Sequence, residues 1–176
     1  MRYNVSQLLK SPTGATRHYQ LHEDISDLDP NIKPLSNLDG EITMIRTGEG
    51  ILVNGDLHLT AELQCRRCLD LFSAAIRFAI EEEFKPTVDI VTGAKIPQTE
   101  EDEPATQIDA QHILDLTEVI RQDLMLALPM YPVCRSRCEG LCPNCGQNWN
   151  DGPCDCTPEE IDPRLAVLKQ LLEEEA

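Results

Sequence analysis

The chain has 176 residues, of which 31 are acidic and 15 are basic, so its formal net charge is −16 at pH 7. Such an excess of negative charge disfavours broad electrostatic binding to RNA, DNA or anionic membranes, and any contact with nucleic acid must be local. No apolar run approaches the roughly 20 residues that a helix needs to span a bilayer, and residues 1–20 lack the pattern of a signal peptide. We therefore expect a soluble, cytoplasmic protein of one domain, with or without a small appendage.

Residues 1–35 predict a helix and a strand that extend the main domain at its N-terminus. Apolar residues recur at helical spacing over residues 5–9, and Asn4 or Ser6 can cap this helix. Residues 16–22 alternate between apolar and polar side chains, which predicts a strand with one solvated face. The proline-containing stretch that follows predicts an irregular connection.

From residue 41 the pattern changes to the two-residue period of antiparallel strands. We expect one strand over residues 41–47 and a second from residue 51, and the dipeptide Asn54-Gly55 predicts either a hairpin turn or a bulge. Two long alternating runs follow, over residues 57–65 and 72–84. Together they predict a β-hairpin with a Cys-x2-Cys tip, Cys65-Arg66-Arg67-Cys68.

A loop and a helix complete the predicted core. Residues 86–107 are acidic, contain prolines and show no period, which is typical of a mobile loop. Asp115 or Thr117 can cap a helix that Pro129 ends. Its apolar stripe is expected to pack against the sheet, and it consists of Val119, Ile120, Leu124, Leu126 and Leu128.

These patterns predict an α+β fold, in which an antiparallel β-sheet is packed by one or two helices and followed by a cysteine-rich, zinc-binding C-terminal segment. We divide the chain into an N-terminal extension (1–35), a core of sheet and helix (36–133) and a final part (134–176). The final part contains the zinc segment and a C-terminal helix that Asp162 and Pro163 begin.

Six of the eight cysteines lie within residues 134–156, a segment with almost no aliphatic side chains. A Cys-x2-Cys turn points two thiolates to the same side of a loop, and Cys142 and Cys145 have this spacing. Cys154 and Cys156 can complete a tetrahedral zinc site. Disulfides need an oxidising compartment and buried free thiols need apolar neighbours, so both alternatives are weaker. We expect a structural zinc ion here.

The other four cysteines allow a second zinc ion, which would join the hairpin tip to the C-terminal segment: Cys65, Cys68, Cys134 and Cys138. This link would close a loop across 65 intervening residues and would restrict the unfolded chain. In a competing partition, Cys134 and Cys138 share an ion with Cys142 and Cys145, and the hairpin pair joins Cys154 and Cys156. We favour the first partition. In both partitions, four thiolates occupy all the coordination positions of each metal ion, so each site is structural rather than catalytic.

Four arginines lie between the ligands of this second site: Arg66, Arg67, Arg135 and Arg137. Folding would gather them on an otherwise acidic protein. Their charge can offset a zinc–tetrathiolate centre, which is formally about −2. It can equally bind a partner or the phosphates of RNA.

Cys65 and Cys68 also have the spacing of a redox pair, so a thiol oxidoreductase is an alternative function. A redox Cys-x-x-Cys normally lies at a helix N-terminus beside a parallel strand, where the helix dipole lowers a thiol pKa. Here both flanks are predicted antiparallel strands, which favours half of a metal site.

Several motifs resemble those of one protein family in both order and spacing. They are the run Leu63-Gln64-Cys65-Arg66-Arg67-Cys68-Leu69 with Phe72, the strand end Glu81-Glu82-Glu83-Phe84, the helix from Asp115 to Pro129, the run from Cys134 to Asn150, and Asp162-Pro163-Arg164-Leu165. From about residue 36 onward the chain resembles the YceD-like family, the bacterial large ribosomal RNA subunit accumulation proteins. The resemblance implies a role in the synthesis, processing or stability of large-subunit ribosomal RNA, without an established catalytic residue.

We therefore expect a non-enzymatic accessory factor in ribosome biogenesis that acts in the accumulation or processing of large-subunit ribosomal RNA. Its partner would be that RNA, a large-subunit ribosomal protein or an assembly intermediate, with no membrane and no small-molecule substrate. The alternative is a zinc-stabilised acidic adaptor that binds a basic ribosomal protein without touching RNA. An enzyme, either a thiol oxidoreductase using Cys65 and Cys68 or an RNA hydrolase, is disfavoured because the sequence offers no Ser-His-Asp or Cys-His constellation.

Overall fold

The computed structural model describes residues 1–97 and 103–156, so the helix expected from Asp162 lies outside the described residues. Within them the α+β class is confirmed. No helix of this part is long and apolar enough to cross a membrane. In chain order the elements are β1 (Arg2–Asn4), α1 (Ser6–Leu9), β2 (Thr16–Glu23), β3 (Lys33–Pro34), β4 (Leu38–Arg46), β5 (Ile51–Gln64), β6 (Leu71–Pro86), the 3-10 helix η1 (Pro104–Thr106), β7 (Gln107–Ile108), β8 (Ile113–Asp115) and α2 (Thr117–Ala127).

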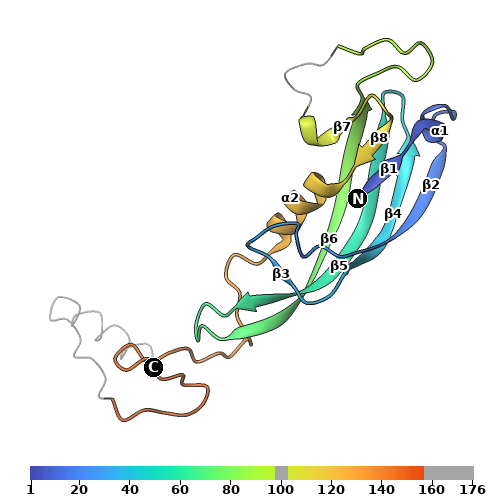
Figure 1. Cartoon of the computed structure of the whole chain (residues 1–176). Helices are drawn as coiled ribbons and strands as arrows, with labels where there is room; N and C mark the ends of the chain where they lie inside the picture. Colours follow the sequence, from blue (N-terminus) through green and yellow to red (C-terminus); the bar gives the residue numbers. More distant parts are fainter. Residues whose placement is uncertain (98–102, 157–176) are drawn as a thin grey trace, which may run out of the picture.

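One six-stranded sheet dominates the described part of the chain. Its strand order is β2-β4-β5-β6-β7, and β3 pairs with β5 away from this path. Neighbouring strands are antiparallel except for β6 and β7, which are parallel. Figure 1 shows a long, curved sheet with α2 along β6 on one face and the cysteine-rich segment beyond the tip of the β5–β6 hairpin. The sheet thus carries this hairpin tip to one end of the molecule.

The β5–β6 hairpin follows the alternation that the sequence predicts. Its register pairs Ile51 with Phe84 at one end and Gln64 with Leu71 at the other. One face of the hairpin contributes the buried side chains, and the positions between them are half-buried or exposed. The buried residues are Ile51, Val53, Leu57, Leu59 and Ala61 of β5 and Ile76, Ile80 and Phe84 of β6. Because side chains alternate along a strand, the register that buries the β5 leucines also turns Cys65 inward, where it is 0% exposed.

The dipeptide Asn54-Gly55 forms neither the hairpin turn nor the bulge expected from the sequence. Strand β5 runs through it without interruption, and Gly55 pairs with Ile42 of β4 and Ile80 of β6. A Cβ atom at this position would lie 2.4 Å from the carbonyl oxygen of Glu41. Glycine is required here for the close approach of β4, which begins at Leu38, earlier than expected.

Helix α2 lies where the sequence predicts it. The N–H and hydroxyl of Thr117 both donate to Oδ1 of Asp115, at 3.0 and 2.6 Å. This gives a partner to one of the backbone N–H groups that have none within the helix at its start. Three residues of the expected apolar stripe are buried, namely Val119, Ile120 and Leu124. Leu126 is 83% exposed, so its placement in the stripe is wrong. It lies two residues beyond Leu124 and therefore faces the opposite side of the helix.

A small second sheet joins the N-terminus to the start of α2, and no pattern in the sequence indicated it. Strand β1 pairs antiparallel with β8, and Nε of Arg2 donates to Oδ2 of Asp115 at 2.7 Å. The expected helix follows as α1 and buries Leu8 and Leu9. Strands β1 and β8 have three residues each, too few for alternation to be recognised.

Residues 86–107, the expected mobile loop, contain local hydrogen bonds in the parts that the structure describes. Oδ1 of Asp89 accepts the N–H groups of Val91 and Thr92 at 3.0 and 2.6 Å. Strand β7 then adds to the edge of β6. The mobility of this loop stays a prediction.

The contact at Gly55 predicts that Gly55→Ala destabilises the sheet. The new methyl group would meet backbone that cannot move without disturbing the β4–β5 ladder, so the free energy of unfolding should fall by about 1–3 kcal/mol in urea denaturation. The matched control is Gly48→Ala, because no atom lies within 4 Å of a Cβ at Gly48. Equal stability of the two variants would contradict the proposed role of Gly55.

Candidate metal centres

The tip of the β5–β6 hairpin is closed by backbone hydrogen bonds around two cysteines. The N–H of Cys65 donates to the carbonyl oxygen of Asp70 at 2.8 Å, and the N–H of Leu69 donates to that of Cys65 at 2.9 Å. Leu69 has a φ of 61°, in the left-handed region that bulky residues rarely adopt. This tight turn points Cys65 and Cys68 to the same side, and both are buried.

The chain after α2 is fastened to this tip through two arginines. The backbone N–H of Arg66 donates to the carbonyl oxygen of Pro132 at 2.8 Å. Nη1 of Arg67 donates to the carbonyl oxygen of Cys138 at 2.9 Å. The segment from residue 132 to 138 therefore lies against the tip, 65 or more residues away from it in sequence.

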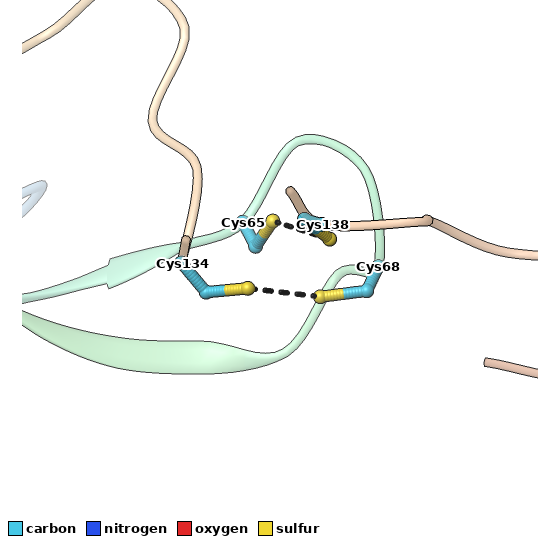
Figure 2. Close-up of side chains that lie close together, drawn as sticks. All are labelled: Cys65, Cys68, Cys134 and Cys138. Atoms are coloured by element: carbon cyan, nitrogen blue, oxygen red, sulfur yellow. Dashed lines mark hydrogen bonds between the residues drawn. The ribbon is translucent and has the colours of Figure 1, made fainter. Parts of the chain in front are cut away.

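Four cysteines meet where these two segments touch, and they are the residues for which the sequence predicts the second zinc ion. Because they come first in the chain, we call them the first cysteine group: Cys65, Cys68, Cys134 and Cys138. Figure 2 shows their sulfur atoms pointing toward one another, two from the hairpin tip and two from the later segment. The Sγ atoms of Cys65 and Cys138 are 3.8 Å apart, and those of Cys68 and Cys134 are 3.7 Å apart.

This geometry fits a tetrahedral zinc ion. With Zn–S bonds of about 2.3 Å, the sulfurs of a tetrahedral site are about 3.8 Å apart. All four Sγ atoms of the first group lie within 4.8 Å of one another. Soft thiolate donors in such a set suit Zn²⁺ better than hard cations such as Mg²⁺ or Ca²⁺. The first group can therefore hold a metal ion.

The thiols of the first group have opposite pKa shifts. The N–H of Cys68 is the main cause that lowers the pKa of Cys65, to about 6, and a side-chain hydrogen bond from Asn150 lowers the pKa of Cys138. The N–H of Asp70 lowers the pKa of Cys68, but burial and the neighbouring Cys65 thiol outweigh it and raise the pKa. Burial raises the pKa of Cys134. Only a bound cation would let all four thiols ionise together.

The second cysteine group lies within the C-terminal segment alone, and its Sγ atoms are also within 4.8 Å of one another: Cys142, Cys145, Cys154 and Cys156. The N–H of Gly146 donates to the carbonyl oxygen of Cys142 at 2.9 Å. Gly146 has a φ of 75°, the left-handed conformation expected after the second ligand of such a turn. Cys142 is buried and Cys145 is exposed.

Trp149 shapes the electrostatics of the second group. Its Nε1–H donates to Sγ of Cys154 at 3.4 Å. This hydrogen bond is the main cause that lowers the pKa of Cys154, to about 6. The side chain of Cys145 and burial raise the pKa of Cys156 to about 12. As in the first group, one thiolate disfavours ionisation of its neighbours until a cation is present.

The structure groups the cysteines as the favoured partition has them. The competing partition, which combines the pairs at 134/138 and 142/145, is not formed. It fails because Arg66 and Arg67 hold the segment around Cys134 and Cys138 against the hairpin tip. The spacing of the cysteines predicts eight ligands, but it does not show which segments of the chain are in contact.

The expected arginine cluster is exposed at the first group, but its members have different neighbours. The guanidinium carbon of Arg66 lies 4.0 Å from the ring centroid of Tyr131, a cation–π contact. Nε of Arg135 donates to Oδ1 of Asn150 at 3.2 Å. Arg137 is exposed. Together with the Arg67 contact described above, these positions place the four arginines around the first group.

Three residues near the two groups were missed by sequence reasoning: Tyr131, Trp149 and Asn150. The sequence does contain a hint of a role for Trp149 and Asn150, because Asn148-Trp149-Asn150 lies between ligands of the second group without an obvious structural role. Spacing alone could not show that their side chains donate to sulfur.

The described residues thus define an α+β protein with two candidate metal centres at one end of a sheet. A family model described as large ribosomal RNA subunit accumulation protein YceD matches residues 53–172. The chain belongs to this family, as the resemblance of its motifs predicted.

Curated relatives are similar to parts of this chain, and one of them bears the name of the family. An uncharacterized protein of Mycobacterium tuberculosis is 35% identical over 135 residues, which cover 77% of this chain and 62% of the relative. A chloroplast protein of Arabidopsis thaliana, named large ribosomal RNA subunit accumulation protein YCED homolog 1, is 36% identical over 61 residues, or 35% of this chain and 19% of the relative. The uncharacterized protein YlbN of Bacillus subtilis is 32% identical over 63 residues, or 35% of this chain and 37% of the relative.

The chain spans less than two thirds of the length of its mycobacterial relatives. No solved structure matches it.

The two groups predict two zinc ions per chain after reconstitution with zinc and removal of the excess. Cys68→Ser with Cys134→Ser should reduce the content to one ion, and so should Cys154→Ser with Cys156→Ser, because each pair of changes leaves only two thiolates in its group. Elemental analysis of the purified protein measures this.

The control is Ser136→Ala, an exposed serine between two ligands, which should keep both ions. A wild-type chain without zinc, or paired variants that retain both ions, would contradict the assignment of the two groups.

Proposed function

We propose that this chain is a non-enzymatic, cytoplasmic accessory factor in the accumulation of large-subunit ribosomal RNA, stabilised by two structural zinc ions. The observation that carries the proposal is the family match over residues 53–172, because this range contains all eight cysteines and the four arginines. The Arabidopsis relative bears the same description.

The proposed contact with RNA is the exposed surface around the first cysteine group, which we call the arginine surface: Arg66, Arg67, Tyr131, Arg135 and Arg137. Guanidinium groups bind phosphates bidentately and also stack on bases. Arg67 and Arg135 each use one nitrogen in a bond within the protein, so other N–H groups remain for a ligand. The net charge of −16 would confine binding to this surface.

Action by binding rather than catalysis is supported by the chemistry of the two groups. Four thiolates saturate a tetrahedral ion and leave no position for water or substrate. Cys65 and Cys68 lie at the tip of an antiparallel hairpin and are 0% and 3% exposed. A redox pair needs at least one accessible thiolate of low pKa, so this burial disfavours the thiol oxidoreductase alternative.

A second candidate is the adaptor that binds a basic protein, and one observation favours it. Large apolar side chains are exposed at the hairpin tip and in the segment after α2, among them Leu69 (53%), Leu71 (61%) and Met130 (85%). Exposed apolar residues near one another are typical of protein interfaces. A ribosomal protein bound there would bring the chain to the same assembly intermediate without direct contact with RNA.

Removal of charge from the arginine surface tests the RNA proposal. Arg66→Gln with Arg137→Gln should weaken binding to large-subunit ribosomal RNA fragments about 10-fold or more at low salt, and should reduce the slope of log K against log salt by about one per lost phosphate contact. Filter binding at several salt concentrations measures both quantities. The matched control is Arg77→Gln on the exposed face of the sheet.

Binding by the double variant that equals that of the Arg77→Gln control would exclude RNA contact through this surface.

The adaptor candidate makes a different prediction. Leu71→Ser with Met130→Ser should then reduce co-sedimentation with large-subunit assembly particles and leave binding to naked RNA unchanged.

A further inference from the structure

Two adjacent residues of the C-terminal segment donate hydrogen bonds to different cysteine groups. Nε1 of Trp149 donates to Sγ of Cys154 in the second group at 3.4 Å. Nδ2 of Asn150 donates to Sγ of Cys138 in the first group at 3.3 Å. The two groups are therefore linked through two neighbouring side chains of a single turn.

The side chain of Asn150 is held in a fixed orientation. Its Oδ1 accepts hydrogen bonds from Nε of Arg135 at 3.2 Å and from the N–H of Glu139 at 3.0 Å. With its oxygen turned to these two donors, the amide must direct its NH₂ group the other way. That group reaches Cys138 and also Oδ1 of Asn148, the latter at 2.7 Å. These contacts orient the side chain of Asn150 so that its NH₂ group donates to the sulfur of Cys138.

The turn that carries Asn150 is attached on both sides. Toward the hairpin, Nδ2 of Asn148 donates to Oδ2 of Asp70 at 2.7 Å. Toward the second group, the N–H of Cys142 donates to the carbonyl oxygen of Gln147 at 2.8 Å. The N–H of Trp149 also donates to the carbonyl oxygen of Gly140 at 2.9 Å. Backbone hydrogen bonds thus join the turn to Gly140 and Cys142 at the start of the second group. The side chain of Trp149 joins it to Cys154 at the other end, so closure of the second group adds a further attachment to the turn.

We propose that Asn150 is a positioning residue for metal binding by the first cysteine group and that it couples the two centres, so that an ion in the second group strengthens binding in the first. This inference rests on the metal binding proposed above. Closure of the second group fixes the turn, the turn fixes Asn150, and Asn150 stabilises the negative charge on Cys138 by a hydrogen bond to its sulfur.

The two groups differ in exposure, which gives the coupling a direction. In the first group Cys65, Cys68 and Cys138 are buried. In the second group Cys145 is exposed. A chelator can reach the second group more easily, so loss of its ion would come first and would then weaken the link between the hairpin and the C-terminal segment.

A double-mutant cycle on the 176-residue chain tests the coupling. Zinc affinity of the first group is measured by competition with a chromogenic chelator in four proteins: wild type, Asn150→Ala, Cys145→Ser with Cys154→Ser, and the combination. The zinc transfer that belongs to each group is identified by comparison with Cys68→Ser/Cys134→Ser protein, which keeps only the second group. Asp151→Ala, an exposed neighbour, is the control.

Asn150→Ala should weaken zinc binding by the first group about 10-fold or more, as loss of a hydrogen-bond partner to a metal ligand does. In the protein without the second group the same change should cost less than about 2-fold, because the turn that carries Asn150 then lacks its attachment to Cys154 and positions Asn150 less firmly. Trp149→Phe should weaken zinc binding by the second group before it weakens zinc binding by the first.

An unchanged affinity in Asn150→Ala, or an equal effect in the presence and absence of the second group, would overturn the coupling. A wild-type chain that binds no zinc would instead overturn the metal proposal itself. The two failures are therefore distinguishable.

Discussion

The contact between the β5–β6 hairpin tip and the segment around Cys134 and Cys138 is the interaction that positions the cysteine-rich segment and both cysteine groups. The cysteine-rich segment has almost no aliphatic side chains, so it cannot fold by burying a core of its own. Its described part is positioned instead by backbone and arginine hydrogen bonds to the tip and by sulfur atoms gathered at metal-ligand spacing. A strong bond across so long a loop removes much of the freedom of the unfolded chain.

The sheet and the cysteine groups are therefore not independent features. The β5–β6 register that buries the aliphatic core also turns Cys65 inward, directly after the last residue of β5, so one alternation sets both sheet packing and the placement of this ligand. The second group stands beyond the first and contacts it through the turn at Asn150. The exposed arginines lie around this junction, which is where we propose the contact with RNA.

Much of this could be predicted from the sequence, and the failures have physical reasons. Long alternating strands and the amphipathic helix were recognisable because many residues repeat the same signal. Strands β1 and β8 were missed because three residues cannot show a period. Asn54-Gly55 was misjudged because a glycine that permits close approach of a neighbouring strand has the same sequence signature as a turn. The ligands were found by spacing, but Tyr131 and Asn150 act through contacts that only the fold creates.

The most direct test is hydrogen exchange of the Arg66 amide, followed by NMR with and without a zinc chelator. This N–H donates to Pro132 across the junction of hairpin and segment. We predict that it is protected in the zinc-bound protein and exchanges much faster after chelation, while amides of the β4–β5 ladder keep their protection. Equal protection of the Arg66 amide in both states would show that metal does not fasten the hairpin to the segment.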